Sequence, residues 1–220
     1  MFDRAAWPRV LPFALYMAFV VLNDGLGRLG VDDQQLRWLY AVKIGAVSLA
    51  LLHYRRRYDE LAWPRLPRRC WLLAVAAGAL VLLLWIRLNA GWMVVGASAG
   101  FDPGGPADID WPLAAVRLAG AALVVPVMEE LFWRSFLLRW LVDPQFLQVS
   151  PARVNVRAFL VSVILFGVEH SLWLAGIVAG AVFTLLYMRS RNLWTAIVAH
   201  AVTNGLLGVW IIATENWAYW

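Results

Sequence analysis

The stretch Val124-Val-Pro-Val-Met-Glu-Glu-Leu-Phe-Trp-Arg-Ser-Phe-Leu-Leu138 places two adjacent carboxylates and a guanidinium inside a long apolar segment. Ionisable groups are costly in a bilayer, so inside a membrane helix they usually mark function. Two more polar pairs, Phe166-x-x-x-His170 and His200-x-x-x-Asn204, occur in later apolar segments. Brought together, these groups could activate a water molecule and hold an oxyanion, which predicts a hydrolase that works within the membrane.

The composition indicates an all-α polytopic membrane protein. Of the 220 residues, 62% are hydrophobic and 15% are charged, and the mean hydropathy is +0.67. A bundle of about seven transmembrane helices around a polar intramembrane cavity is expected. The seven predicted spans are residues 7–22, 37–54, 70–86, 112–138, 157–171, 172–188 and 193–213.

The number of spans depends on the uncharged segment 88–101. It contains three glycines, and the pattern Gly96-Ala-Ser98-Ala-Gly100 resembles a nucleophile elbow without the strand and helix that such an elbow needs. The segment is interpreted as a loop, which could be re-entrant, and an eighth span is the alternative.

Arginines are distributed unevenly between the predicted loops. Thirteen fall on one side of the membrane and three, Arg28, Arg37 and Arg87, on the other. This bias predicts a cytoplasmic N-terminus and an outer C-terminus. It also accounts for the net charge of +5 without a nucleic-acid partner. Arg9, at the start of the first span, is expected to snorkel to the interface, and Lys43 and Arg117, inside spans, to pair with acidic groups or lipid phosphates.

Glu129 and Glu130 are expected to have different roles. Residues four apart share a helix face, so Glu130 can pair with Arg134, while Glu129 points about 100° away. A carboxylate beside an arginine stays ionised, whereas one that faces a semi-dry cavity is suited to act as a general base. We therefore expect Glu129 to be the base, with Glu130 and Arg134 in support.

The later pairs complete the predicted site. His200 and Asn204 lie one turn apart and could both donate hydrogen bonds to an oxyanion. His170 could share a water molecule with Glu129, and Phe166, one turn earlier, could wall off the site. Membrane helices also use Glu, His and Asn as interhelical contacts. Two alternatives therefore stay open: a non-catalytic scaffold or chaperone that binds a partner's transmembrane segment, and a small ion-coupled transporter.

These motifs, in this order, resemble those of the CPBP family, the group of CAAX-protease and bacteriocin-processing intramembrane proteases related to type II prenyl endopeptidases. The resemblance covers residues 112–213, whereas residues 1–111 carry no recognised motif, and the whole chain is expected to form one membrane domain. The resemblance implies that Glu129 and His170 activate the attacking water and that His200 and Asn204 stabilise the oxyanion. The implied substrate is a membrane-associated peptide or protein.

Two further implications concern the metal and the compartment. Glu129, His170 and His200 could supply ligands to a zinc-like ion, although a metal-free, glutamate-activated water fits the residues equally well. The stretch 124–138 is also similar to a subgroup of short bacterial members associated with exosortase systems. That likeness implies a bacterial inner membrane and a substrate other than a prenylated CAAX protein.

Overall fold

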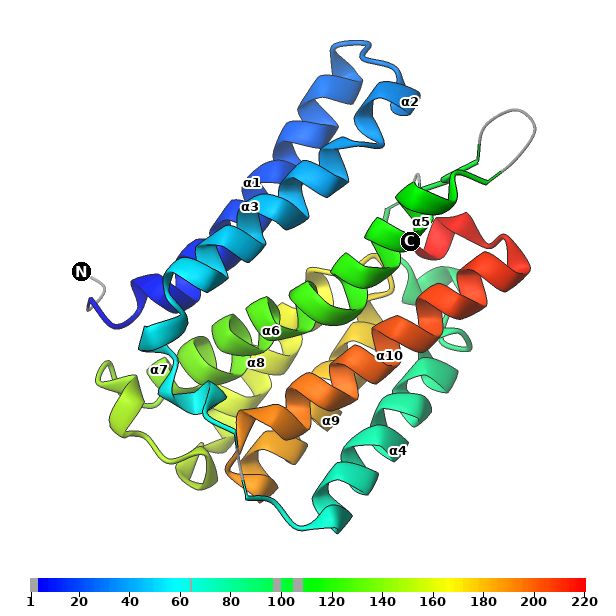
Figure 1. Cartoon of the computed structure of the whole chain (residues 1–220). Coiled ribbons are helices and arrows are strands. Elements are labelled where there is room, and N and C mark those ends of the chain that lie inside the picture. The colour runs from blue at the N-terminus through cyan, green and yellow to red at the C-terminus, as the bar shows by residue number, and fades with distance from the viewer. Residues whose placement is uncertain (1–3, 64, 97–99, 105–108) are drawn as a thin grey trace.

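The computed structural model describes residues 4–63, 65–96, 100–104 and 109–220, and in this part of the chain the regular secondary structure is helical (Figure 1). The helices are α1 Trp7–Arg28, α2 Asp33–Leu36, α3 Leu39–His53, α4 Arg68–Trp85, α5 Trp111–Ala119, α6 Val125–Glu130, α7 Leu138–Trp140, α8 Val156–Val168, α9 Trp173–Ser190 and α10 Leu193–Thr214. The all-helical prediction is confirmed.

The longest helix runs from Trp111 to Trp140, and its α-helical hydrogen bonding is interrupted twice. It joins α5, α6 and α7 through two π-helical segments, Gly120–Val124 and Leu131–Leu137. Asp110 caps its start by accepting a hydrogen bond from the Leu113 backbone N–H (3.0 Å), and Pro112 lies in the first turn, where its missing N–H costs nothing. We call residues 111–140 the catalytic helix.

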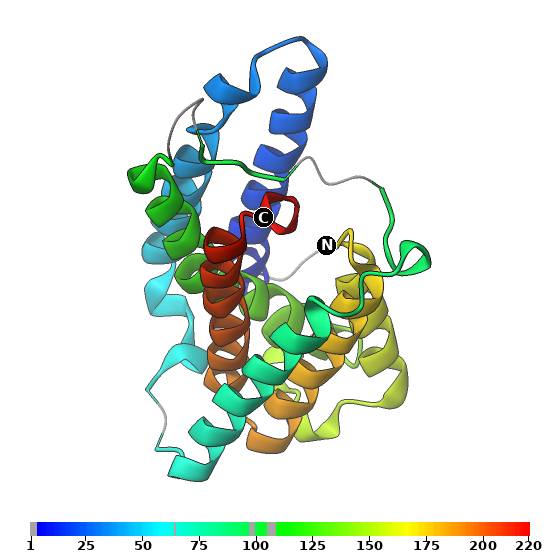
Figure 2. The same ribbon diagram turned by 90° about the vertical axis from the view of Figure 1, so that its right-hand side faces the viewer.

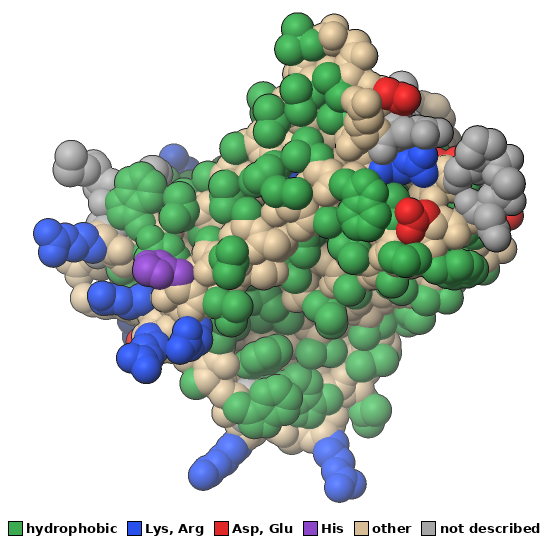
Figure 3. All heavy atoms as spheres, turned by 45° about the horizontal axis from the view of Figure 1, so that its top comes forward, with side chains coloured by type: hydrophobic (Ala, Val, Ile, Leu, Met, Phe, Trp, Pro, Cys, Tyr) green, Lys and Arg blue, Asp and Glu red, His purple; other side chains and the backbone are tan. Residues whose placement is uncertain are grey.

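Five helices are long and apolar enough to cross a membrane: α1, α4, the catalytic helix, α9 and α10. The shorter apolar helices α3 and α8 correspond to two more of the predicted spans. The segment between α4 and α5 contains a short 3₁₀ turn, Gly91–Met93, and the predicted Ser98 pattern lies partly outside the described residues. Hydrophobic side chains cover most of the face in Figure 3, with Lys and Arg at its margins, as expected for a protein in a bilayer.

Close packing at small residues brings the helices of the C-terminal half together. A Cβ atom on Gly176 of α9 would lie 3.0 Å from the Gly167 Cα of α8, and one on Gly180 would lie 3.0 Å from the Phe166 ring. Gly176 and Gly180 thus allow α8 and α9 to pack closely. α4 packs along α10 in the same way, through Gly78 and Ala199 (Figures 1 and 2).

A buried ion-pair network fastens α1 to the far end of the catalytic helix. Arg9 is 2% exposed and donates to both oxygens of Glu60 (2.7 and 2.6 Å). Ser135 also donates to Glu60, and Arg139 donates to Ser135 Oγ (2.7 Å). The expectation that Arg9 snorkels is therefore wrong: the Glu60 carboxylate lies close enough to neutralise its guanidinium inside the protein.

Removal of the Glu60 charge tests this network. Glu60→Gln leaves Arg9 and Arg139 as buried, uncompensated cations, so we expect a loss of about 3 kcal/mol of stability, measured by unfolding in detergent. The matched control is Asp24→Asn, which removes an exposed pair with Arg28 (2.9 Å) and should cost less than about 1 kcal/mol. Equal effects of the two substitutions would contradict the structural role of the network.

The same carboxylate predicts a pH dependence. Burial raises the pKa of Glu60, but the hydrogen bonds and charge of Arg9 and the hydrogen bond from Ser135 outweigh burial, so the pKa lies below its ordinary value. A lowered folded-state pKa gives stability that is complete above the unfolded-state pKa and is lost as the pH falls through the folded-state pKa. Between about pH 6 and about pH 3, the melting temperature should therefore fall further in the wild type than in Glu60→Gln. Parallel melting curves across this range would refute the prediction.

Candidate active site

Glu130 is the fully buried centre of the polar cluster, with no exposed surface. Its Oε1 atom lies 2.9 Å from Arg134 Nη1 and 2.9 Å from His200 Nδ1. The ion pair expected between Glu130 and Arg134 is present, and the bond to His200 adds a link to α10 that the sequence did not predict. One carboxylate thus holds two helices in register.

Aromatic rings and a backbone carbonyl surround the Arg134 guanidinium. Its Cζ atom lies 4.3 Å from the centre of the Phe166 ring and 5.5 Å from that of Phe183, and Nη2 donates to the Gly180 carbonyl (3.4 Å). Cation–π contacts and the carboxylate compensate for the lost hydration of a buried arginine. Phe166, 2% exposed, therefore packs on the supporting ion pair as well as walling the site.

Glu129 faces a different environment from Glu130. Its side chain lines a cavity of about 190 Å³, although the residue is only 6% exposed. Its Oε2 atom is buried and has no hydrogen-bond partner in the described part of the chain. A carboxylate oxygen without a protein partner can accept a hydrogen bond from a water molecule or a substrate.

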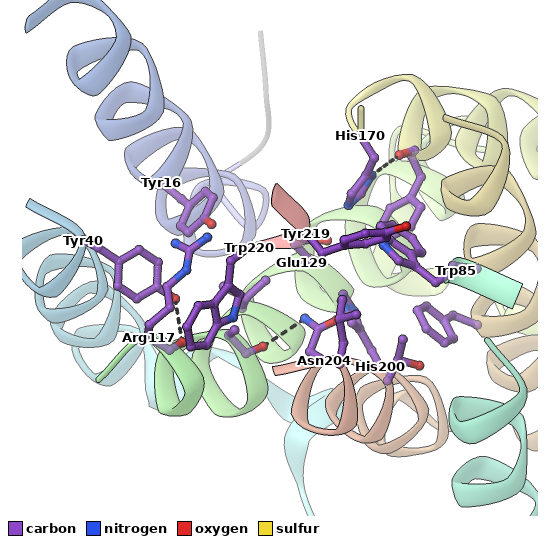
Figure 4. Close-up of a pocket in the computed structure, with 17 residues that line it drawn as sticks. Tyr16, Tyr40, Trp85, Arg117, Glu129, His170, His200, Asn204, Tyr219 and Trp220 are labelled. Atoms are coloured by element: carbon purple, nitrogen blue, oxygen red, sulfur yellow. Dashed lines mark hydrogen bonds between the residues drawn. The ribbon is translucent and has the colours of Figure 1, made fainter. Parts of the chain in front are cut away.

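His170, His200, Asn204 and Phe166 line the same cavity as Glu129 (Figure 4). Glu129 comes from the catalytic helix, Phe166 and His170 come from the end of α8 and the turn after it, and His200 and Asn204 come from α10. The four predicted catalytic side chains are therefore brought together, with Glu130 and Arg134 buried behind them. Glu169, next to His170, does not line the cavity.

The two histidines are fixed through their Nδ1 atoms. His170 Nδ1 lies 2.8 Å from the Phe166 carbonyl oxygen, which can only accept, so Nδ1 carries the proton and a neutral ring has its lone pair on Nε2. His200 Nδ1 lies 2.9 Å from the Glu130 carboxylate, which orients the ring. His170 is thereby suited to accept a proton or hydrogen bond, and His200 is held in place by Glu130.

Asn204 is held by an interruption in the catalytic helix. Its Nδ2 atom donates to the Ala121 carbonyl (2.9 Å), within the first π-helical segment. In π-helical register the N–H of residue 126 would reach this carbonyl, but residue 126 is proline and has no N–H. Asn204 satisfies the carbonyl instead, and its second amide N–H is left for another acceptor. Pro126 therefore frees a backbone carbonyl that Asn204 satisfies.

The N-terminal half also contributes to the cavity, which the sequence analysis did not foresee. Tyr16 of α1, Tyr40 of α3, Trp85 of α4 and Arg117 of α5 line it, together with Trp220. The Trp85 ring packs edge-on against His170, with ring centres 5.3 Å apart. Residues 1–111 carry no motif because aromatic wall residues have no fixed spacing that could identify them.

Metal ligation was one of the open expectations for Glu129, His170 and His200. Across the described ranges, no three His, Cys, Asp or Glu side chains are gathered closely enough to hold a metal ion. One ring nitrogen of each histidine is already hydrogen-bonded to a protein oxygen. Such bonds leave Nε2 of each ring for another partner, so metal binding by Glu129, His170 and His200 stays a prediction.

Comparison with protein families supports the resemblance seen in the motifs. The family model described as type II CAAX prenyl endopeptidase Rce1-like matches residues 111–206. This segment contains the catalytic helix, α8, α9 and most of α10, so the motifs, the cavity and the family match coincide. The CPBP-type resemblance is confirmed: residues 111–206 form an Rce1-like domain, and the family implies a protease in the membrane.

The remaining comparisons add no relatives. No curated protein matches the chain, and no solved structure matches it.

The different surroundings of the two glutamates predict different effects on stability. Glu130→Gln removes the charge that compensates Arg134 and should cost about 3 kcal/mol. Glu129→Gln replaces a buried carboxylate whose Oε2 has no partner, so the cost should be below about 1 kcal/mol. Unfolding of both variants in the same detergent measures the difference. The assignment would be overturned if Glu129→Gln were the more damaging substitution.

Proposed function

We propose that the protein is an intramembrane endopeptidase that hydrolyses a peptide bond in a membrane-associated peptide or protein. The observation that carries the proposal is the single cavity shared by Glu129, His170, His200 and Asn204 within the segment that matches the Rce1-like family. A base, a second proton acceptor and two donors around one space meet the needs of water attack on a carbonyl.

The attacking water binds between Glu129 and His170. Glu129 accepts one proton as the water oxygen bonds to the carbonyl carbon, and His170 Nε2 accepts a hydrogen bond from the other water hydrogen and orients it. Glu129 then delivers its proton to the amide nitrogen as the carbon–nitrogen bond breaks. The carbonyl product keeps the second water proton as a carboxylic acid and passes it to the amine, so the products are a carboxylate and an ammonium group, and the carboxylate of Glu129 is restored.

The oxyanion is stabilised on the opposite side by His200 and Asn204. This role requires a proton on His200 Nε2 while Glu130 accepts from its Nδ1, and Asn204 donates its second amide N–H. In the state that the mechanism requires, Glu129 and Glu130 are carboxylates and Arg134 and His200 are cations, so these four side chains have no net charge. Neutrality of the resting group limits the cost of holding charges in a low-dielectric cavity.

The arginine distribution favours an N-terminus in the cytoplasm and a C-terminus on the outer side of the membrane. A bacterial inner membrane is the proposed location. The proposed substrate is an extended peptide segment, because protease sites generally need access to the backbone carbonyl, which a continuous helix keeps hydrogen-bonded.

Cleavage by purified protein in liposomes tests the proposal. Wild type is incubated with a pool of apolar membrane peptides, and the products are identified by mass spectrometry. Glu129→Gln should lower the rate by about 10²–10⁴-fold, the range for loss of a general base, and His170→Ala should also lower it strongly. Glu169→Gln, a neighbouring carboxylate outside the cavity, is the matched control and should retain activity within about tenfold.

Two arms complete this experiment. A chelator separates the open alternatives: unchanged cleavage supports the glutamate-activated water, and loss restored by added zinc supports a metal. If folded wild type cleaved no peptide, or if Glu129→Gln cleaved as fast as wild type, the proposed hydrolysis would be refuted.

A further inference from the structure

A second polar cluster lies at the N-terminal end of the catalytic helix, outside the proposed catalytic group. Lys43 of α3 is 9% exposed, and its Nζ lies 4.0 Å from the centre of the Tyr16 ring and 4.9 Å from that of Tyr40. Arg117 of α5 packs on Tyr40 and on Phe101, with its Cζ 4.1 Å from the Tyr40 ring centre and 5.1 Å from that of Phe101. Both cations therefore lie on the ring of Tyr40.

The two cations have no acidic counterpart among the described side chains. The expected pairing with an acidic group is absent: neither Lys43 nor Arg117 forms an ion pair in the described part of the chain, and Arg117 Nε is buried without a partner. Asp24 lines the same space as Lys43 but is paired with Arg28 (2.9 Å) and largely exposed. A buried lysine and a half-buried arginine, held mainly by aromatic rings, leave a demand for an anion.

This cluster adjoins the catalytic cavity. Lys43 and Arg117 line a cavity of about 410 Å³, and Arg117, Tyr40 and Trp220 line both that cavity and the one containing Glu129. Figure 4 shows Tyr16, Tyr40 and Arg117 on one side of Trp220, with Glu129, His200 and Asn204 on the other. A ligand in one space can thus extend into the other.

The π-helical turn aligns the two groups. Arg117 and Glu129 are twelve residues apart, which in an ideal α-helix leaves an angular offset of about 120°. The π-helical segment Gly120–Val124 between them absorbs one extra residue and reduces the offset to about 20°. The Cα atoms are then separated by about 17 Å along the helix, which about five extended residues can span.

α3 is held against this part of the catalytic helix by a close contact. A Cβ atom on Gly120 would lie 2.6 Å from Tyr40 Oη and 2.7 Å from Ile44 Cγ1. Tyr40 also donates from its hydroxyl to the Arg117 carbonyl oxygen (3.3 Å). The Tyr40 ring, which contacts both Lys43 and Arg117, is therefore fixed relative to Glu129, as a binding site requires.

We propose that Lys43 and Arg117 bind a carboxylate of the peptide substrate about five residues from the bond that is cleaved. The inference rests on the proposed peptide hydrolysis and adds a specificity site to it. A carboxylate of the substrate is the favoured anion because both cations line a cavity that adjoins the one containing Glu129 and shares Tyr40, Arg117 and Trp220 with it. Arg117 offers a fork of N–H donors, and Lys43 a point charge.

The test uses two matched pools of apolar heptapeptides, one with a free C-terminal carboxylate and one with a C-terminal carboxamide. Binding is measured with Glu129→Gln protein in phosphatidylcholine nanodiscs, so that it does not depend on cleavage. The carboxylate pool should bind about 10- to 100-fold more tightly, the range for charge-assisted hydrogen bonds. Lys43→Met and Arg117→Met should remove most of that preference, and Arg117→Lys should keep part of it. The control Arg87→Met, at an exposed arginine that lines neither cavity, should keep all of it.

The outcomes separate this inference from the proposed function. Carboxylate preference that depends on Lys43 and Arg117, with no cleavage by wild type, would support the anion site and refute the peptidase. Cleavage by wild type with equal binding of both pools would refute the anion site and leave the peptidase standing. Replacement of part of the phosphatidylcholine by phosphatidylglycerol is the last arm. Thermal stabilisation by this anionic lipid that Lys43→Met and Arg117→Met abolish, without any carboxylate preference, would assign the site to lipid and overturn the proposal.

Discussion

The buried carboxylate of Glu130 is the constraint on which the site depends. It holds Arg134 on its own helix and His200 on α10 at the same oxygen, 2.9 Å from each. Because a buried charge without compensation costs several kcal/mol, these three side chains can be buried only as a group. Their pairing fixes α10 against the catalytic helix, and Asn204, one turn after His200, is thereby placed beside the π-helical carbonyl of Ala121.

The two π-helical segments give the catalytic helix its functional faces. The first, ahead of Pro126, exposes the carbonyl that orients Asn204 and turns Arg117 toward the side of Glu129. The second begins directly after Glu130. In a regular α-helix the Val125 N–H would satisfy the Ala121 carbonyl, and Asn204 would be left without this partner. The irregular backbone at mid-membrane is tolerated because side chains of neighbouring helices complete its hydrogen bonds.

The sequence predicted the parts of the protein that depend on local spacing. Residues four apart share a helix face, so the Glu130–Arg134 pair and the common helix face of His200 and Asn204 could be predicted from their spacing. The sequence could not show that Arg9 finds Glu60 fifty-one residues away, that His200 bonds to Glu130, or that Lys43 and Arg117 meet on Tyr40. These contacts depend on which helices become neighbours, and apolar spans of similar composition do not encode that choice locally.

The most direct test of the central claim compares a phosphonate analogue of the tetrahedral intermediate with the unmodified peptide of the same sequence. Dissociation constants are measured for wild type, Asn204→Ala and His200→Ala in nanodiscs. An enzyme that stabilises an oxyanion in this cavity should bind the analogue at least about 100-fold more tightly than the peptide, and both variants should lose most of that preference. Equal affinity of wild type for the two ligands would contradict the account, because the cavity would then recognise a peptide without stabilising its hydrolysis.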